Sequence, residues 1–190
     1  MPGYDEDGRF CKYMTEHELK MTRLASNLGV GAKLISYIAT KMSDDEVYKY
    51  YFGNLSPIDA SLFEDGMLEW YHVTMAKCDY TLRKRRQMTL EEFDCFKRKF
   101  KLLQDNGILY FDIHASNIMY GTNSNDEMEI FIIDYGHACL RSEVEHNPSV
   151  VPDWYEENNY DLDLRRYAEC QILPHCQEEL YTGYRNLWGE

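Results

Sequence analysis

Apolar residues recur at helical spacing in two stretches of the chain. The first stretch follows Thr15 and ends at Gly29, and the second follows Thr89 and ends at Gly107. In each, a glutamate three residues after the threonine completes a capping-box pattern, and the glycine marks a stop. The apolar positions are Met21, Leu24, Ala25 and Leu28 in the first stretch, and Leu90, Phe93, Phe96, Phe100 and Leu103 in the second. This periodicity predicts two amphipathic helices.

Strand-like stretches flank the first predicted helix. KLISYIAT (33–40) and LEWYHVTM (68–75) are rich in β-branched and aromatic residues, which favours strands, and a short strand-like piece before the helix ends near Lys12. The acidic, turn-rich stretch between the two strands, 41–67, resembles an insertion with one short helix in SDDEVYKYYF.

The second half of the chain alternates short apolar runs with polar segments. ILYF (108–111) and IFII (130–133) predict two strands around a polar loop, and NYDLDLRRYAECQIL (159–173) is compatible with a helix. We find no internal repeat and no low-complexity linker.

Composition and charge narrow the class of protein. The 190 residues suffice for one compact unit, and 44% hydrophobic with 14% aromatic residues favours a folded core. The formal charge of -13 argues against a whole surface that binds nucleic acid or an anionic membrane. The six cysteines lack paired spacing and no signal-peptide pattern opens the chain, so we expect a reducing cytosol or nucleus. No apolar run approaches the roughly 18 residues of a membrane span.

Two carboxylates and an amide stand at the edges of these apolar runs. Asp112 follows ILYF, Asn117 comes five residues later, and Asp134 closes IFII. Phosphoryl transfer needs a carboxylate to orient the acceptor hydroxyl and hard oxygen ligands for a divalent metal. The spacing therefore fits a base and two metal ligands on neighbouring segments. The alternative is a polar β-hairpin whose Asp and Asn cap turns.

Two sequence motifs in this region resemble those of a known superfamily. DIHASN (112–117) and IIDYG (132–136) are similar to the catalytic loop and the metal-binding turn of the protein-kinase-like superfamily. The resemblance implies that Asp112 is the catalytic base, that Asn117 and Asp134 bind Mg²⁺ or Mn²⁺, and that ATP is the phosphoryl donor. It also implies an α+β, two-lobed fold, with a truncated small β lobe up to about residue 77 and a mainly helical large lobe after it.

The resemblance extends to the nucleotide site. WYHVTMAKCDYTL (70–82) resembles the last small-lobe strand and the hinge, with Met75 as gatekeeper and Ala76, Lys77 and Cys78 offering backbone hydrogen bonds to adenine. A buried strand that runs into a turn would carry the same letters. Lys12 resembles the lysine that binds the nucleotide phosphates, and Glu18 its glutamate partner, with Glu16 as an alternative.

Several features depart from the family pattern. Tyr110 and Phe111 replace the usual His-Arg pair, and His114 stands where aminoglycoside and choline kinases also carry histidine. Only eleven residues precede Lys12, so we expect the glycine-rich flap to be absent or vestigial. No Ala-Pro-Glu segment follows. Asp161 or Asp163 resembles the aspartate that braces the catalytic loop, although a solvated acidic helix start would carry the same residues.

These features rank three functions. A minimal serine/threonine protein kinase is favoured, a pseudokinase that binds a partner protein is second, and a small-molecule kinase is third. We expect a protein substrate or partner, no membrane and no nucleic acid, in the cytosol or nucleus of the cell, or of a host cell if the chain is viral or a bacterial effector. The basic stretch 83–101 could receive an acidic partner, although the polar face of a surface helix explains it too. Cys170, His175 and Cys176 lack the four-ligand spacing of a structural zinc site.

Overall fold

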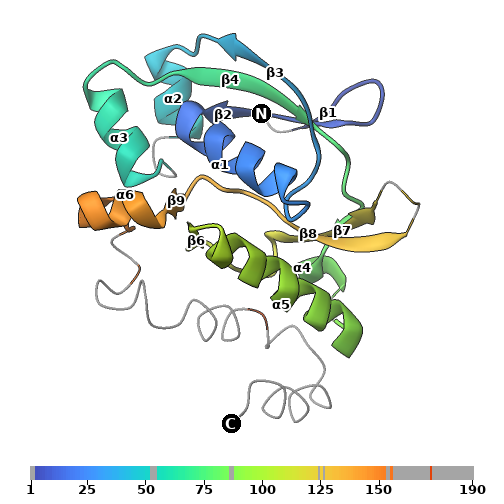
Figure 1. Cartoon of the computed structure of the whole chain (residues 1–190). Helices are drawn as coiled ribbons and strands as arrows, with labels where there is room; N and C mark the ends of the chain where they lie inside the picture. The colour runs from blue at the N-terminus through green and yellow to red at the C-terminus, as the bar shows by residue number, and fades with distance from the viewer. Residues whose placement is uncertain are drawn as a thin grey trace.

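The computed structural model describes residues 3–51, 55–85, 88–123, 125, 127–152, 155 and 172. Its first half contains an antiparallel sheet of four strands in the order β1-β2-β4-β3 (Figure 1). The strands are β1 (Gly3–Tyr4), β2 (Phe10–Thr15), β3 (Leu34–Thr40) and β4 (Trp70–Met75). The strands predicted from the sequence are confirmed, and Lys12 lies in the middle of β2 rather than at its end.

Helix α1 (Glu16–Asn27) follows β2 directly and packs along this sheet (Figure 1). Thr15 caps it, since its hydroxyl accepts a hydrogen bond from the Glu18 amide at 3.1 Å. The other half of the predicted capping box does not form, because the Glu18 carboxylate turns to Lys12 instead. Leu24, predicted to be buried, is exposed to solvent.

The insertion between β3 and β4 contains two described helices, where the sequence suggested one. Helix α2 (Asp44–Tyr50) begins with a capping box between Ser43 and Glu46, and α3 (Pro57–Glu64) is capped by Ser56. The second helix carries a readable start signal, because Ser56 is an N-cap residue and Pro57 occupies the first turn. In Figure 1, α3 lies beside the beginning of α1.

The second half combines helices with two small antiparallel sheets. One sheet has the order β5-β7-β8, and the other pairs β6 with β9. The strands are β5 (Tyr80–Thr81), β6 (Ile108–Tyr110), β7 (Ile118–Thr122), β8 (Met128–Ile132) and β9 (Ala138–Leu140). The helices are α4 (Leu82–Arg85), α5 (Leu90–Asp105), α6 (Arg141–His146) and a 3-10 turn, Pro148–Val150.

The predicted arrangement of the motif segment needs a correction. The polar loop expected over 112–129 contains strand β7, which forms a hairpin with β8. The run 108–111 contributes β6, which pairs with β9, and the run 130–133 belongs to β8. Burial alternates along β7, with Ile118 and Tyr120 inside and Met119 less buried, so the strand signal was present but short.

Helix α5 supplies much of the main core, which also takes Met21 and Ala25 from α1 and the strands β6 to β9. Four of its five predicted stripe residues are buried, but Leu90 is 43% exposed because it is the first residue after the cap. Lys99 is buried on the same face. A second apolar cluster, which includes Met14, Val73 and Met75, lies under the four-stranded sheet.

The structure is thus a mixed α+β fold with several antiparallel sheets. In the part of the chain described, no helix has the length and apolar character needed to cross a membrane. The predicted helix 159–173, with Asp161 and Asp163, and the cluster of Cys170, His175 and Cys176 fall outside the described residues, apart from Ile172.

Candidate functional site

An apolar cavity of about 160 Å³ opens between the four-stranded sheet and the β7–β8 hairpin. Its walls come from both halves of the chain and include Phe10, Met14, Ala32, Met75, Met119 and Ile132. Two charged side chains, Lys12 and Asp134, also line it. The cavity is therefore an apolar slot with a lysine and a carboxylate on its wall.

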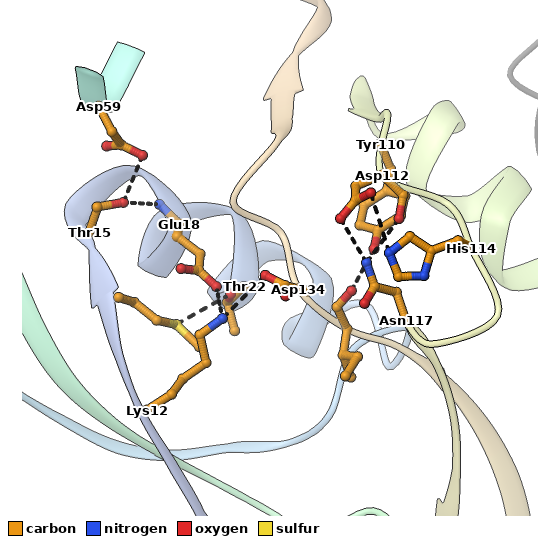
Figure 2. A network of polar contacts seen from close by, with 12 residues as sticks. Lys12, Thr15, Glu18, Thr22, Asp59, Tyr110, Asp112, His114, Asn117 and Asp134 are labelled. Atoms are coloured by element: carbon orange, nitrogen blue, oxygen red, sulfur yellow. Dashed lines mark hydrogen bonds and ion pairs between the residues drawn. The ribbon is translucent and has the colours of Figure 1, made fainter. Parts of the chain in front are cut away.

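Lys12 joins the two halves of the chain through its ammonium group (Figure 2). Its Nζ lies 2.5 Å from Glu18 Oε1 and 3.2 Å from Asp134 Oδ1. Glu18 comes from the first turn of α1, whereas Asp134 follows β8. The structure thus places Glu18 next to Lys12, while the alternative Glu16 is exposed.

The two carboxylates that share Lys12 differ in burial, and their pKa values shift in opposite directions. Burial raises the pKa of Glu18 to about 7, because the attraction of Lys12 offsets only part of the lost solvation and Asp134 repels the charged form. Asp134 is about half exposed, and although burial raises its pKa, the attraction of Lys12 prevails and the net shift is downward. Burial lowers the pKa of Lys12, but its two partners raise it above the ordinary value. At neutral pH, Lys12 and Asp134 are therefore charged, whereas Glu18 is only partly ionised.

The backbone around Asp134 fixes its side chain. Asp134 has a φ of 64°, the one positive φ found among the non-glycine residues of the described chain. Such a conformation is uncommon for a residue with a Cβ and needs support from its neighbours. On the preceding residue, the Ile133 amide donates to the Asn117 carbonyl at 2.9 Å and the Ile133 carbonyl accepts from the Tyr110 hydroxyl at 2.5 Å. These bonds hold the Asp134 segment against the loop of Asn117.

Asp112 and Asn117 form a second polar group on that loop (Figure 2). The Asn117 Nδ2 donates to the Asp112 carbonyl at 3.0 Å and to its Oδ2 at 2.9 Å. Asn117 is buried, whereas the Asp112 carboxylate remains partly exposed. His114 Nε2 lies 3.5 Å from Asp112 Oδ1. The buried amide therefore orients a carboxylate that solvent can reach.

Sequence reasoning named three oxygen-bearing side chains, and the structure brings two of them into direct contact. In Figure 2, Asp134 lies between the Lys12 group and the Asp112–Asn117 group, with its carboxylate on the Lys12 side. Within the described residues, no three His, Cys, Asp or Glu side chains are close enough to hold a metal by themselves. Mg²⁺ usually takes one or two protein ligands and completes its shell with phosphates and water. An ionised Asp134 beside the Asn117 loop fits that pattern.

The predicted hinge borders the cavity. Met75 ends β4 and is buried against the slot, and Ala76 and Cys78 also line it. The Ala76 amide donates to the Lys33 carbonyl at 2.8 Å, so only its carbonyl remains for a ligand. Among the backbone hydrogen bonds of the described residues, none engages the Ala76 carbonyl or the Cys78 amide. Lys77 does not line the cavity itself, but its Nζ lies 5.7 Å from the centre of the ring of Tyr4, which does.

Sequence reasoning missed the apolar walls of the cavity and one buried acid. Phe10, Met14, Ala32 and Met119 look like ordinary core positions in the sequence, and only the strand pairing shows that they face a cavity. The missed acid is Asp59 on α3, which is fully buried. Its signal was its place three residues after Ser56 at a helix start.

The basic stretch 83–101 is partly neutralised by acids of the same chain. Lys97 pairs with Asp94 at 2.7 Å, Lys99 with Glu129 at 2.6 Å and Lys101 with Asp105 at 2.5 Å. Arg85 pairs with Glu92. Apart from Lys99, which is buried, these contacts agree with polar side chains on a helix surface. An acidic partner at this stretch stays a proposal.

Comparisons with known proteins give one distant likeness. No family model matches the chain, and neither does any curated protein. Among solved structures, it is similar to the PK-1 kinase of the Cydia pomonella granulovirus, with 17% sequence identity and a TM-score of 0.42. The similarity covers 70% of this chain and 43% of the viral kinase, so the chain spans less than half of that protein's length. The chain is thus partly similar to a kinase structure, and what its site can do follows from its own residues.

Proposed function

We propose that the chain is a small protein-kinase-like phosphotransferase that moves the γ-phosphoryl group of ATP to a hydroxyl, with protein Ser or Thr as the favoured acceptor. One observation carries the proposal. Lys12, at the wall of an apolar cavity, pairs with both Glu18 and Asp134, and the Asp134 segment is hydrogen-bonded to the loop that holds Asp112 and Asn117.

The size of the cavity suggests how the nucleotide lies. A volume of about 160 Å³ is below the roughly 300–1,000 Å³ of a typical small-molecule site, so the slot takes the adenine ring and leaves the phosphates outside. The Ala76 carbonyl and the Cys78 amide then face the polar edge of the base. The phosphates extend toward Lys12, whose raised pKa keeps it cationic over the physiological range.

The reaction needs few protein groups beyond these. When bound by Asp134 and Asn117, Mg²⁺ supplies charge neutralisation for the phosphate oxygens. Asp112 accepts the proton of the acceptor hydroxyl while the hydroxyl oxygen bonds to the γ-phosphorus. The bond from that phosphorus to the bridging oxygen breaks, and ADP leaves with the electron pair. The hydrogen bond from Asn117 keeps the Asp112 carboxylate turned toward the acceptor.

A second candidate is a partner-binding pseudokinase. The described turn between β1 and β2 is acidic, and its amides are already engaged, because Asp7 and Arg9 donate their backbone N–H to the Asp5 carboxylate at 3.0 and 2.8 Å. A turn of this kind does not cradle phosphates as free amides do. A third candidate is a small-molecule kinase, favoured by the place of His114 beside Asp112.

Transfer of radiolabelled phosphate from ATP and Mg²⁺ to generic protein acceptors tests the proposal. Asp112→Asn and Asp134→Asn should each lower the rate by about 10²-fold or more, because one loses the proton acceptor and the other a metal ligand. Asp105→Asn, an exposed carboxylate on α5, is the matched control and should leave the rate unchanged. If the wild-type chain transfers nothing and Mg·ATP does not raise its melting temperature, the pseudokinase candidate replaces the enzyme.

A further inference from the structure

One carboxylate of the insertion 41–67 is buried against the start of α1. Asp59, on α3, is only 2% exposed. Its Oδ2 accepts hydrogen bonds from the Thr15 hydroxyl at 3.0 Å and from the Ser56 hydroxyl at 2.8 Å. Figure 2 shows the contact with Thr15 on the opposite side of α1's first turn from Lys12. Asp59 therefore fixes the N-cap residue of the helix that carries Glu18.

Thr15 connects Asp59 to Glu18 through a single hydroxyl group. The Thr15 Oγ1 donates to Asp59 and at the same time accepts from the Glu18 amide at 3.1 Å. His17, also on the first turn, contacts the Ala138 carbonyl through its Nε2 at 2.7 Å. The turn is thus held from one side by α3 and from the other by β9. Small movements of this turn would displace the Glu18 carboxylate from Lys12.

Burying Asp59 is costly, which argues that it has a role. Its second oxygen, Oδ1, is buried and makes no hydrogen bond to any described residue. A buried carboxylate with an unsatisfied oxygen lowers the stability of the fold relative to a well-packed apolar residue at the same place. Part of this cost is offset by the two hydroxyl donors and by the positive end of the α1 dipole.

We propose that Asp59 is a positioning residue that acts through Thr15 to hold Glu18 against Lys12, so that the insertion sets the affinity for nucleotide. The inference rests on the proposed function, because it names a determinant of the same nucleotide site. It predicts that a change 44 positions away from Thr15 in the sequence alters the binding of Mg·ATP without touching the cavity.

A double-mutant cycle on Mg·ATP affinity tests this inference. Asp59→Ala should weaken binding about fivefold or more in the wild-type background, and by less than about twofold in the Glu18→Gln background, where no carboxylate remains to be placed. Glu64→Gln, an exposed acid on the same helix, should leave affinity unchanged. Equal effects of Asp59→Ala in both backgrounds would overturn the proposal, because a purely structural role is additive.

Hydrogen exchange supplies a readout that does not need nucleotide. In Asp59→Ala, the amides of Glu18 and Leu19 should exchange at least about tenfold faster, while those in the middle of α5 stay unchanged. If the wild-type chain binds no Mg·ATP, the proposed function fails, and this measurement alone decides whether Asp59 holds the turn. Unchanged exchange at Glu18 overturns the inference. Should Asp59→Ala not fold, Asp59→Asn keeps an acceptor for Thr15 and should show the same changes at smaller size.

Discussion

At the scale of single residues, the site depends on how three charges share a small space. Lys12 holds two carboxylates that differ in exposure, and the more buried one, Glu18, takes the upward pKa shift. Asp134 is more exposed, and the attraction of Lys12 lowers its pKa, so it keeps its charge. Under the proposed function, Glu18 would be the structural acid and Asp134 the metal ligand.

The raised pKa of Glu18 predicts a pH dependence of stability. The pKa is about 7 in the folded chain against an ordinary 4.5, so the contribution of Glu18 is complete below pH 4.5 and is lost as the pH rises through 7. Asp134 has the opposite shift, and its contribution is lost only as the pH falls below its ordinary value of 3.8. Between pH 5 and 8, the wild-type free energy of unfolding should therefore fall more steeply than that of Glu18→Gln, by on the order of 1–3 kcal/mol.

Urea unfolding at pH 5, 6, 7 and 8 measures both slopes. All other titratable side chains are the same in both proteins, so the difference between the slopes reports Glu18. Parallel curves for the two proteins would show that Glu18 is ionised throughout.

At the scale of elements, helix α5 contains two apolar positions that the sequence pattern places on the same buried stripe but that differ in burial. Phe96 is buried between Phe93 and Phe100, whereas Leu90 is 43% exposed at the first turn. Phe96→Ala should lower the free energy of unfolding by about 3–5 kcal/mol, since it opens a cavity in the main core. Leu90→Ala should change it by less than about 1 kcal/mol. Chemical denaturation of both variants checks the contrast, and similar losses would place Leu90 in the core.

The elements also show where sequence reasoning succeeds. Helices α1 and α5 were predictable because each combines a capping residue, a regular apolar spacing and a final glycine. Strands β3 and β4 were predictable from composition. The partner of β6 was not, because pairing is decided between segments distant in sequence, and the strand signal of β7 was hidden in a polar loop.

The site divides in the same way. The contact of Asp112 with Asn117 is local, and its spacing could be read directly. Lys12 and Asp134 are 122 positions apart, and only a family resemblance suggested that they meet. Asp59 had no such guide, because it comes from an insertion that the resemblance does not cover.

At the scale of the whole molecule, Lys99 ties three elements together. Its Nζ donates to the Gly29 carbonyl at 2.6 Å, pairs with Glu129 at 2.6 Å and lies 4.6 Å from the centre of the Phe131 ring. These contacts join α5 to the end of α1 and to β8. Lys99→Met should cost about 1–3 kcal/mol, because it leaves the Gly29 carbonyl and the partly exposed Glu129 carboxylate without their charged donor.

Lys101→Met is the matched control, since Lys101 lies on the same helix and its exposed pair with Asp105 should contribute less than about 1 kcal/mol. Thermal and urea unfolding compare the two variants. An equal, small loss in both would mean that Lys99 contributes no more than a surface charge.

If Mg·ATP binds in the cavity between the two halves, it should stabilise the folded chain. Ala32 lines the slot, and Ala32→Phe would fill much of its 160 Å³. At 100 times the Kd, Mg·ATP should stabilise the wild-type chain by about 2.7 kcal/mol, which raises its Tm by roughly 5–10 °C. The Ala32→Phe variant should fold, with a stability within about 1–3 kcal/mol of the wild type, and should show no shift with Mg·ATP because the adenine ring has lost its place.

Ala39→Phe adds the same side chain to an exposed position of β3, away from the slot, and should keep the full shift. Differential scanning fluorimetry with and without Mg·ATP measures all three proteins under one condition. A full shift in Ala32→Phe would show that the nucleotide binds elsewhere, because two rings cannot occupy a space this small. In that event, Lys12 would be a structural cation between two halves of the chain rather than a phosphate ligand.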